Sequence, residues 1–256
     1  MGVVRSLFWE IRMDILSTIR YRFGVLSDVI IYSVLLIFFL LSNSGHSYGE
    51  IYHNVDYRLI LVIGYLAWMY AGTAITSISQ IVSGELKQGT FYKKYNAKYP
   101  LQILLFGRLV ASLLIQSIVM CAILMIAIFV GKVQLVFEPV IIAAIIISTM
   151  GMYGIGLILA GLSLFYKKIG AIHFLVQLFL LFITDTIPVN EGVLVISKIL
   201  PLTSCNIVIK EALDKQNYGS EFLFLCISSV ICVILGYFIF NFFLSKARRK
   251  GNLLFY

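Results

Sequence analysis

The sequence contains few residues whose types and spacing suit catalysis or metal binding. The histidines are His46, His53 and His173, and the four cysteines show no C-x-x-C spacing, so neighbouring positions supply no zinc or haem ligand set. The motifs H-E-x-x-H, G-x-S-x-G and G-x-x-x-x-G-K-[ST] are also missing from the sequence, which argues against an intramembrane enzyme and excludes a P-loop. We therefore expect no catalytic residue, no metal site and no cofactor on this chain.

The polar and aromatic side chains that remain are spaced along apolar segments. Two such series each lie close to one face of a predicted helix, where they can hydrogen-bond a solute that passes between helices. The candidates for lining such a pathway are Trp68, Thr73, Thr76, Gln80, His173, Gln177 and Thr184. Close packing of helices is the alternative role for the same residues, and the sequence leaves both open.

The composition places these series in a membrane. Of 256 residues, 61% are hydrophobic and 12% are charged, whereas an ordinary soluble domain has about 45–50% and about 25%. A membrane-spanning helix needs about 20 predominantly apolar residues. Six segments approach or exceed this length, and we predict an all-α polytopic membrane protein that forms one domain over residues 1–256. The predicted spans are residues 25–41, 59–81, 101–130, 140–165, 170–187 and 222–244.

The distribution of positive charge predicts the orientation of these spans. With six spans both termini lie on one side, and most of the 20 lysines and arginines fall there, in residues 1–23, 83–100, 167–168 and 246–250. Because positive loops stay on the cytoplasmic side, both termini are expected in the cytoplasm, with the protein in the cytoplasmic (inner) membrane of a bacterium. The net charge of +8 therefore suggests contact with membrane lipids and no nucleic-acid partner.

The segment before the first span has its own pattern. Val4, Phe8, Ile11 and Ile15 recur at helical spacing while charged residues fall elsewhere, which predicts an amphipathic helix over residues 1–23 that lies in the membrane interface. An extension of the first span is the alternative. In the fourth span, the glycines Gly151, Gly154 and Gly156 predict close contact with another helix.

Ionisable residues are rare within the predicted spans. Asp28, Arg108 and Asp185 each lie near an end of a span, so we interpret them as anchors that reach the interface rather than as transport groups. Ion-coupled carriers generally place such groups at mid-membrane depth. The near absence of these groups argues against a stand-alone carrier.

The cytoplasmic connection after the second span carries a more specific pattern. Glu85, the pair Gly89-Thr90 and Pro100 resemble the E-x-x-x-G-T…P signature of the permeases of ATP-binding-cassette (ABC) type 2 exporters. The glycine permits a sharp break before a short helix across the membrane face.

Later elements follow the order of the same family. Gly161-Leu162 with Lys167-Lys168 resembles the end of its fourth span, and Pro188 with Pro201-Leu202-Thr203 resembles its external turn. Where the family often has Ser-Gly and a second proline at that turn, this chain has Thr184-Asp185-Thr186 and Pro188 alone.

The resemblance implies a permease that binds an ABC nucleotide-binding subunit and pairs with a second permease, in a homodimer or a paralogous heterodimer. ATP and Mg would be bound by the partner subunit, and residues 83–100 would form a coupling helix. The residues expected to couple to the ATPase are Glu85, Gly89, Thr90, Phe91, Tyr92 and Tyr95, while Lys93, Lys94 and Lys98 are expected to meet lipid phosphates or the ATPase.

The external segment, residues 184–221, contains two apolar stretches that are too short to cross the membrane. We expect them to form re-entrant helices that meet at Pro201. The resemblance assigns an external gate to Pro188, Pro201 and Thr203.

Two further classes of protein remain open. A stand-alone secondary transporter or channel is the main alternative to an exporter permease, and a membrane assembly or anchoring protein is the other. For an exporter, the scarcity of buried charge favours a drug, a peptide antibiotic or another lipid-like amphipathic substrate. Export of a polysaccharide or a lipid-linked glycan is the alternative, because Trp68 and Tyr70 could stack on sugars.

Overall fold

The computed structural model describes residues 2–20, 22–42, 56–95, 101–134, 136, 138–166 and 170–249. These residues form helices joined by short connections and contain no strand, which confirms the predicted all-α class. The helices are α1 (Gly2–Arg20), α2 (Arg22–Leu41), α4 (Tyr57–Lys87), α5 (Phe91–Tyr95), α6 (Leu101–Gly131), α7 (Pro139–Ser163), α8 (Gly170–Ile183), α9 (Glu191–Ser197), α10 (Pro201–Leu213) and α11 (Gly219–Arg249).

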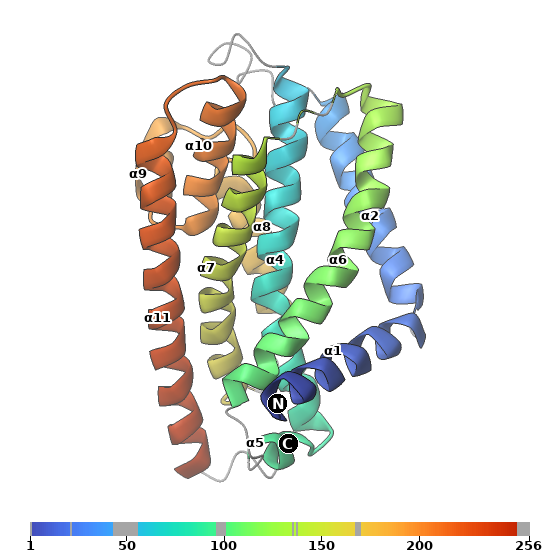
Figure 1. Ribbon diagram of the computed structural model, residues 1–256, viewed down its shortest axis with the longest axis vertical. Helices are drawn as coiled ribbons and strands as arrows, with labels where there is room; N and C mark the ends of the chain where they lie inside the picture. The colour runs from blue at the N-terminus through green and yellow to red at the C-terminus, as the bar shows by residue number, and fades with distance from the viewer. Residues whose placement is uncertain are drawn as a thin grey trace.

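Among the described residues, five helices are long and apolar enough to cross a membrane, namely α2, α4, α6, α7 and α11. They run along the long axis of the molecule (Figure 1). Of the most apolar stretch of α4, 83% is buried, against 22% for α2 and α11 and 28% for α6. Helix α4 is therefore the centre of the bundle, and the outer helices keep apolar faces for lipid or for another membrane protein.

The fifth predicted span, residues 170–187, differs from the structure. Helix α8 ends at Ile183 after 14 residues, a length of about 21 Å at about 1.5 Å per residue, whereas the hydrocarbon layer is about 30 Å thick. The helix is interrupted at Thr184–Thr186, where Asp185 has a φ of 57°, outside the right-handed helical region. A helix that continues to residue 187 is thus wrong, and the count of six spans is not confirmed. Lys167 and Lys168 lie outside the described residues.

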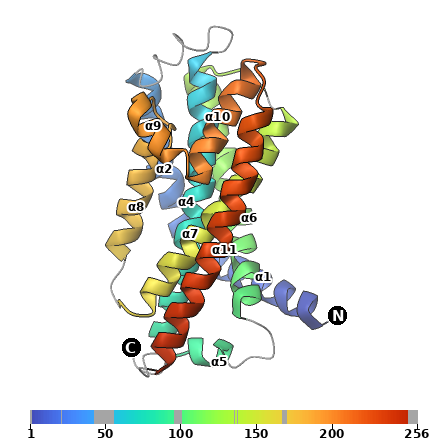
Figure 2. The same cartoon turned by 90° about the vertical axis from the view of Figure 1, so that its left-hand side faces the viewer.

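Helix α1 runs across the bundle near the end at which α5 lies, whereas α9 and α10 lie at the opposite end (Figures 1 and 2). The two helices expected around Pro201 are α9 and α10, and Pro201 occupies the first turn of α10, where its missing N–H is tolerated. Helix α10 packs against α4, α7 and α11. Its buried position explains why residues 201–213 are so apolar.

A buried ion pair holds α10 against the segment that follows α8. Lys210 on α10 is 2% exposed and Asp185 is 5% exposed, and Lys210 Nζ lies 2.5 Å from Asp185 Oδ2. Asn206, one turn earlier, donates to the carbonyl of Thr184 at 2.6 Å and to Thr186 Oγ1 at 3.1 Å. The interpretation of Asp185 as an anchor at the interface is therefore wrong, because its carboxylate is satisfied inside the protein.

Glycines allow α7 to approach its neighbours closely, as predicted. A Cβ at Gly154 would collide with the backbone carbonyl of Cys232 on α11, and one at Gly156 would lie 2.6 Å from the carbonyl oxygen of Ala74 on α4. Gly151 leaves room for the ring of Pro201. Helix α7 thus joins α4, α10 and α11 by backbone contact, which confirms the interpretation of these glycines as packing residues.

We expect Lys210→Met to destabilise the protein strongly. The substitution removes the ammonium group beside a buried carboxylate, and loss of one partner of a buried ion pair costs about 3–5 kcal/mol. Thermal unfolding of the full chain in lipid nanodiscs measures the change.

The double variant Asp185→Asn, Lys210→Met is the matched comparison, because it also removes the carboxylate charge. We expect it to be more stable than Lys210→Met alone. An equal loss in both variants would show that the ion pair does not hold α10.

Candidate functional site

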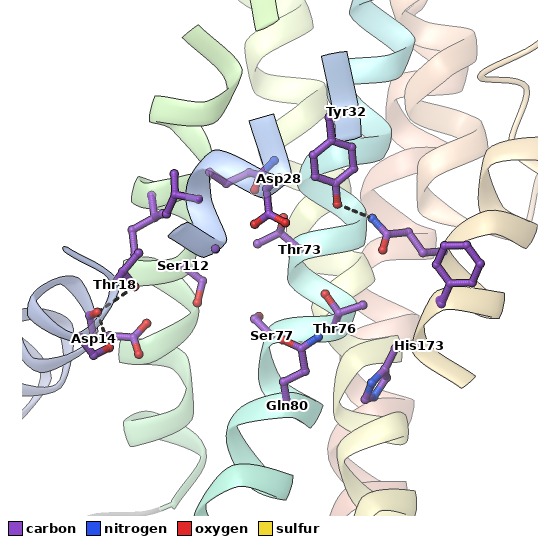
Figure 3. A pocket seen from close by; sticks show the side chains of 17 residues that line it. Asp14, Thr18, Asp28, Tyr32, Thr73, Thr76, Ser77, Gln80, Ser112 and His173 are labelled. Carbon is purple, nitrogen blue, oxygen red and sulfur yellow. Dashed lines mark hydrogen bonds between the residues drawn. The ribbon is translucent and has the colours of Figure 1, made fainter. Parts of the chain in front are cut away.

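A polar cavity of about 560 Å³ lies between α1, α2, α4, α6 and α8. Five residues of the predicted pathway series line it, Thr73, Thr76 and Gln80 from α4 and His173 and Gln177 from α8. Figure 3 shows Thr73, Thr76, Ser77 and Gln80 on one helix and His173 across from them. The structure therefore brings the two series together around one space, as their helical spacing suggests.

Hydrogen bonds between α2, α4 and α8 hold the part of the cavity wall that contains Tyr32 and Gln177. Trp68 Nε1 donates to the carbonyl of Gln177 at 2.9 Å, and Gln177 Nε2 donates to Tyr32 Oη at 3.0 Å. Gly72 leaves room for the side chain of Gln177, because a Cβ at position 72 would lie 2.7 Å from Gln177 Nε2. Tyr65 Oη in turn donates to the carbonyl of Tyr32 at 2.8 Å. These bonds hold the aromatic rings of Tyr32 and Trp68 in a fixed arrangement.

A smaller apolar cavity of about 240 Å³ adjoins the polar one. The two share Asp28, Tyr32, Phe174 and Gln177. The remaining lining of the small cavity is Ile31, Leu35, Trp68, Leu178 and Leu181. Trp68, predicted as a lining residue, is therefore in the apolar cavity rather than in the polar one.

Thr184 does not reach either cavity. It is fully buried, its hydroxyl donates to the carbonyl of Leu180 at 2.7 Å, and its own carbonyl accepts from Asn206. Thr184 shares a helical face with Gln177, but α8 ends before it and the chain turns toward α10. Its placement as a pathway residue is thus corrected to a packing contact beside α10.

The predicted gate residues are also distant from the cavities. Pro188 is half-buried before α9, Pro201 packs against Gly151, and Thr203 is fully buried. Thr203 Oγ1 has no hydrogen-bond partner among the described residues. These three residues lie near α9 and α10, at the end opposite α5, so their role as a gate stays a prediction.

Two acidic residues of the cavity were not predicted as functional. Asp28, interpreted from sequence as an anchor, lines both cavities, and Asp14 on α1 lines the larger one. Figure 3 shows both carboxylates on the side of the cavity formed by α1 and α2. Three further polar groups in the lining lack a partner among the described residues, Ser77 Oγ, Gln116 Nε2 and His173 Nε2.

The orientation of α1 explains how Asp14 reaches the cavity. Leu7, Glu10 and Asp14 recur at helical spacing on the less exposed side of α1, whereas Phe8 and Met13 are 61% and 59% exposed. Helix α1 thus turns Leu7, Glu10 and Asp14 toward the bundle and leaves Phe8 and Met13 exposed on its other side. Burial raises the pKa of Asp14, and the positive charge of Arg108 opposes this rise.

The predicted coupling segment turns sharply after α4. Gly89 has a φ of 66°, which glycine adopts without strain, and the amide of Thr90 donates to the carbonyl of Glu85 at 2.9 Å. Helix α5 follows at once with Phe91. Pro100 and Lys98 lie outside the described residues.

Four charged residues from four helices meet beside this turn, and we call them the ion cluster: Glu10, Glu85, Lys94 and Arg108. Lys94 Nζ lies 2.9 Å from Glu10 Oε2 and 2.7 Å from Glu85 Oε1. Arg108 contacts the same two carboxylates at 2.9 and 3.1 Å. The side chains are 6–19% exposed, so solvent screens these pairs less than pairs on an open surface.

The structure differs from three predictions for this region. Lys94 binds acidic residues of its own chain rather than lipid or ATPase groups, and Arg108 pairs internally instead of reaching the interface. Phe91 is fully buried in the core, so it is not available as an anchor for a partner. Glu85 and Lys94 are nine residues apart along the chain, whereas sequence spacing gave no signal for Glu10 and Arg108.

Tyr92 and Tyr95 remain as aromatic residues near the surface of α5. Tyr92 is 44% exposed. Tyr95 Oη accepts a hydrogen bond from Arg248 at 3.2 Å, which links α5 to the end of α11. Helix α5 is thus tied to the bundle on one side and presents Tyr92 on the other.

Comparison with known proteins supports the resemblance seen in the sequence. Residues 5–205 match the family model of the ABC-2 type transporter, and no curated protein matches the chain. The matched range contains both cavities, the ion cluster and the start of α10, and it covers well over half of the chain. The chain therefore belongs to the ABC-2 type transporter family and is a multi-pass membrane permease of an ABC transporter.

Proposed function

We propose that this chain is the permease subunit of an exporter that a separate nucleotide-binding subunit drives. Two permeases, identical or paralogous, form the pathway, and the partner subunit binds ATP and Mg²⁺. The protein resides in the cytoplasmic membrane of a bacterium, with both termini and α5 on the cytoplasmic side and α10 dipping into the outer leaflet. Its substrate is an amphipathic molecule of the drug, peptide-antibiotic or lipid-like kind.

The ion cluster is the observation that best supports this function. It connects α5 to α1, α4 and α6, and these three helices supply walls of the polar cavity. A displacement of α5 therefore shifts the cavity walls, because paired charges with low exposure resist separation. Closure of the nucleotide-binding subunits on ATP would supply the displacement and bias the permease between two states.

We expect Glu85→Gln to uncouple the permease from ATP hydrolysis. The variant leaves Lys94 and Arg108 with one carboxylate instead of two, so a displacement of α5 moves α4 and α6 less effectively. The complex should still copurify, while stimulation of the ATPase by the permease falls roughly tenfold. Glu138→Gln is the control, because Glu138 lies before α7 and makes no side-chain capping bond. Unchanged stimulation in Glu85→Gln would contradict the mechanism.

We expect Tyr92→Ala to weaken association with the nucleotide-binding subunit. An exposed aromatic anchor at an interface can contribute about 2 kcal/mol, equivalent to roughly a 30-fold change in Kd. Binding of purified permease to its copurifying ATPase measures the change. Tyr237→Ala is the control, since Tyr237 on α11 has a similar exposure of 46%. If no P-loop protein copurifies and transport persists after ATP depletion, the stand-alone transporter is the correct function.

Cysteine substitutions test whether the polar cavity contains water. In a background without the native cysteines, a membrane-impermeant maleimide should label Thr73→Cys and Gln80→Cys at least roughly tenfold faster than buried sites. Ala74→Cys and Thr184→Cys are the buried controls, because both native residues are fully buried. Equal labelling at all four positions would show that water reaches the cavity no better than the buried controls, and would contradict a role for the cavity in the pathway.

A further inference from the structure

The two adjoining cavities together offer one polar and one apolar space, as a site for an amphipathic molecule requires. The larger is polar and the smaller is apolar, and Asp28 lies where they meet. In the small cavity the rings of Tyr32 and Trp68 are arranged edge to face, with centroids 5.9 Å apart. A ligand that fills both cavities therefore needs a polar group near Asp28 and an apolar body beside the two rings.

The charges around the larger cavity are unbalanced. Its described lining includes the carboxylates of Asp14 and Asp28 and contains no lysine or arginine. Within the ion cluster, Lys94 and Arg108 are matched by Glu10 and Glu85. Neither Asp14 nor Asp28 forms an ion pair with a described lysine or arginine, so this space carries excess negative charge.

Buried polar groups in the same lining are available to hydrogen-bond a ligand. Ser77, Gln116 and His173 are 5–9% exposed, and each has a side-chain atom without a hydrogen-bond partner among the described residues. Such groups are uncommon in folded proteins, because loss of hydration without a new bond costs free energy. They come from α4, α6 and α8, so they approach the cavity from three directions.

We propose that the paired cavities select an amphipathic organic cation, an inference that rests on the exporter function proposed above. The positive group lies between Asp28 and Asp14, and the apolar body contacts Trp68 and Leu178. An anion of the same shape is rejected because both carboxylates repel it. The ring of Tyr32, which lines both cavities beside Asp28, adds to this preference, since aromatic rings attract cations.

Tetraphenylphosphonium and tetraphenylborate form a matched pair of probes, because they have similar size and opposite charge. Their binding to the full chain in lipid nanodiscs is measured by equilibrium dialysis, after subtraction of uptake by protein-free nanodiscs. We expect the wild type to bind the cation at least about tenfold more tightly than the anion. Equal affinities, or tighter binding of the anion, would overturn the proposal without any variant.

Substitutions at Asp28 then locate the site. Asp28→Asn should weaken binding of the cation about tenfold and leave binding of the anion unchanged or improved, whereas Asp28→Glu should retain the preference. Glu138→Gln should behave as the wild type. If Asp28→Asn binds the cation as tightly as the wild type, Asp28 is not the selecting residue and the proposal fails.

The same preparation separates this inference from the exporter function. Charge-selective binding without a copurifying ATPase would retain the cation site and contradict the ATP-driven function. An ATPase that copurifies with a permease lacking charge preference would retain the function and contradict the cation site.

Discussion

A charged side chain in apolar surroundings must meet an opposite charge, and this requirement organises the molecule. Near α5, Glu10 and Glu85 neutralise Lys94 and Arg108, and these pairs join four helices. At the other end, Lys210 and Asp185 fasten α10 to the end of α8. Helix α4 runs between these two ends and carries the cavity residues in its middle. The site thus lies between two places where electrostatic pairing fixes the helices.

The sequence predicted the elements that depend on composition and local spacing. Apolar segments of sufficient length identified the long helices, and glycines identified the close contacts of α7. The early end of α8 was not predicted, although the polar residues Thr184, Asp185 and Thr186 interrupt the apolar segment before Ile187. The end depends on the backbone at Asp185 and on the bond from Lys210, which is 25 residues away along the chain.

Some of the residues that line the cavity were predicted from the sequence, and others were not. The series on α4 and α8 followed from helical spacing, and the structure places them around one space. Asp28 was interpreted as an anchor, because a carboxylate near the end of a span normally reaches the interface, and Asp14 was not recognised because it lies in the helix before that span. Only the position of α1 across the bundle shows that these carboxylates face a cavity. Sequence spacing also could not predict that Lys94 contacts Glu10, because the two residues are 84 positions apart along the chain.

The outward face of α1 has a consequence for how the membrane acts on the permease. Phe8, Trp9, Met13 and Leu16 are exposed on this helix, while Asp14 on its inner side borders the cavity. In a membrane, lipid that contacts this exposed face would act on the same helix that forms one wall of the chamber. The width of the chamber is therefore expected to depend on the lipid around α1.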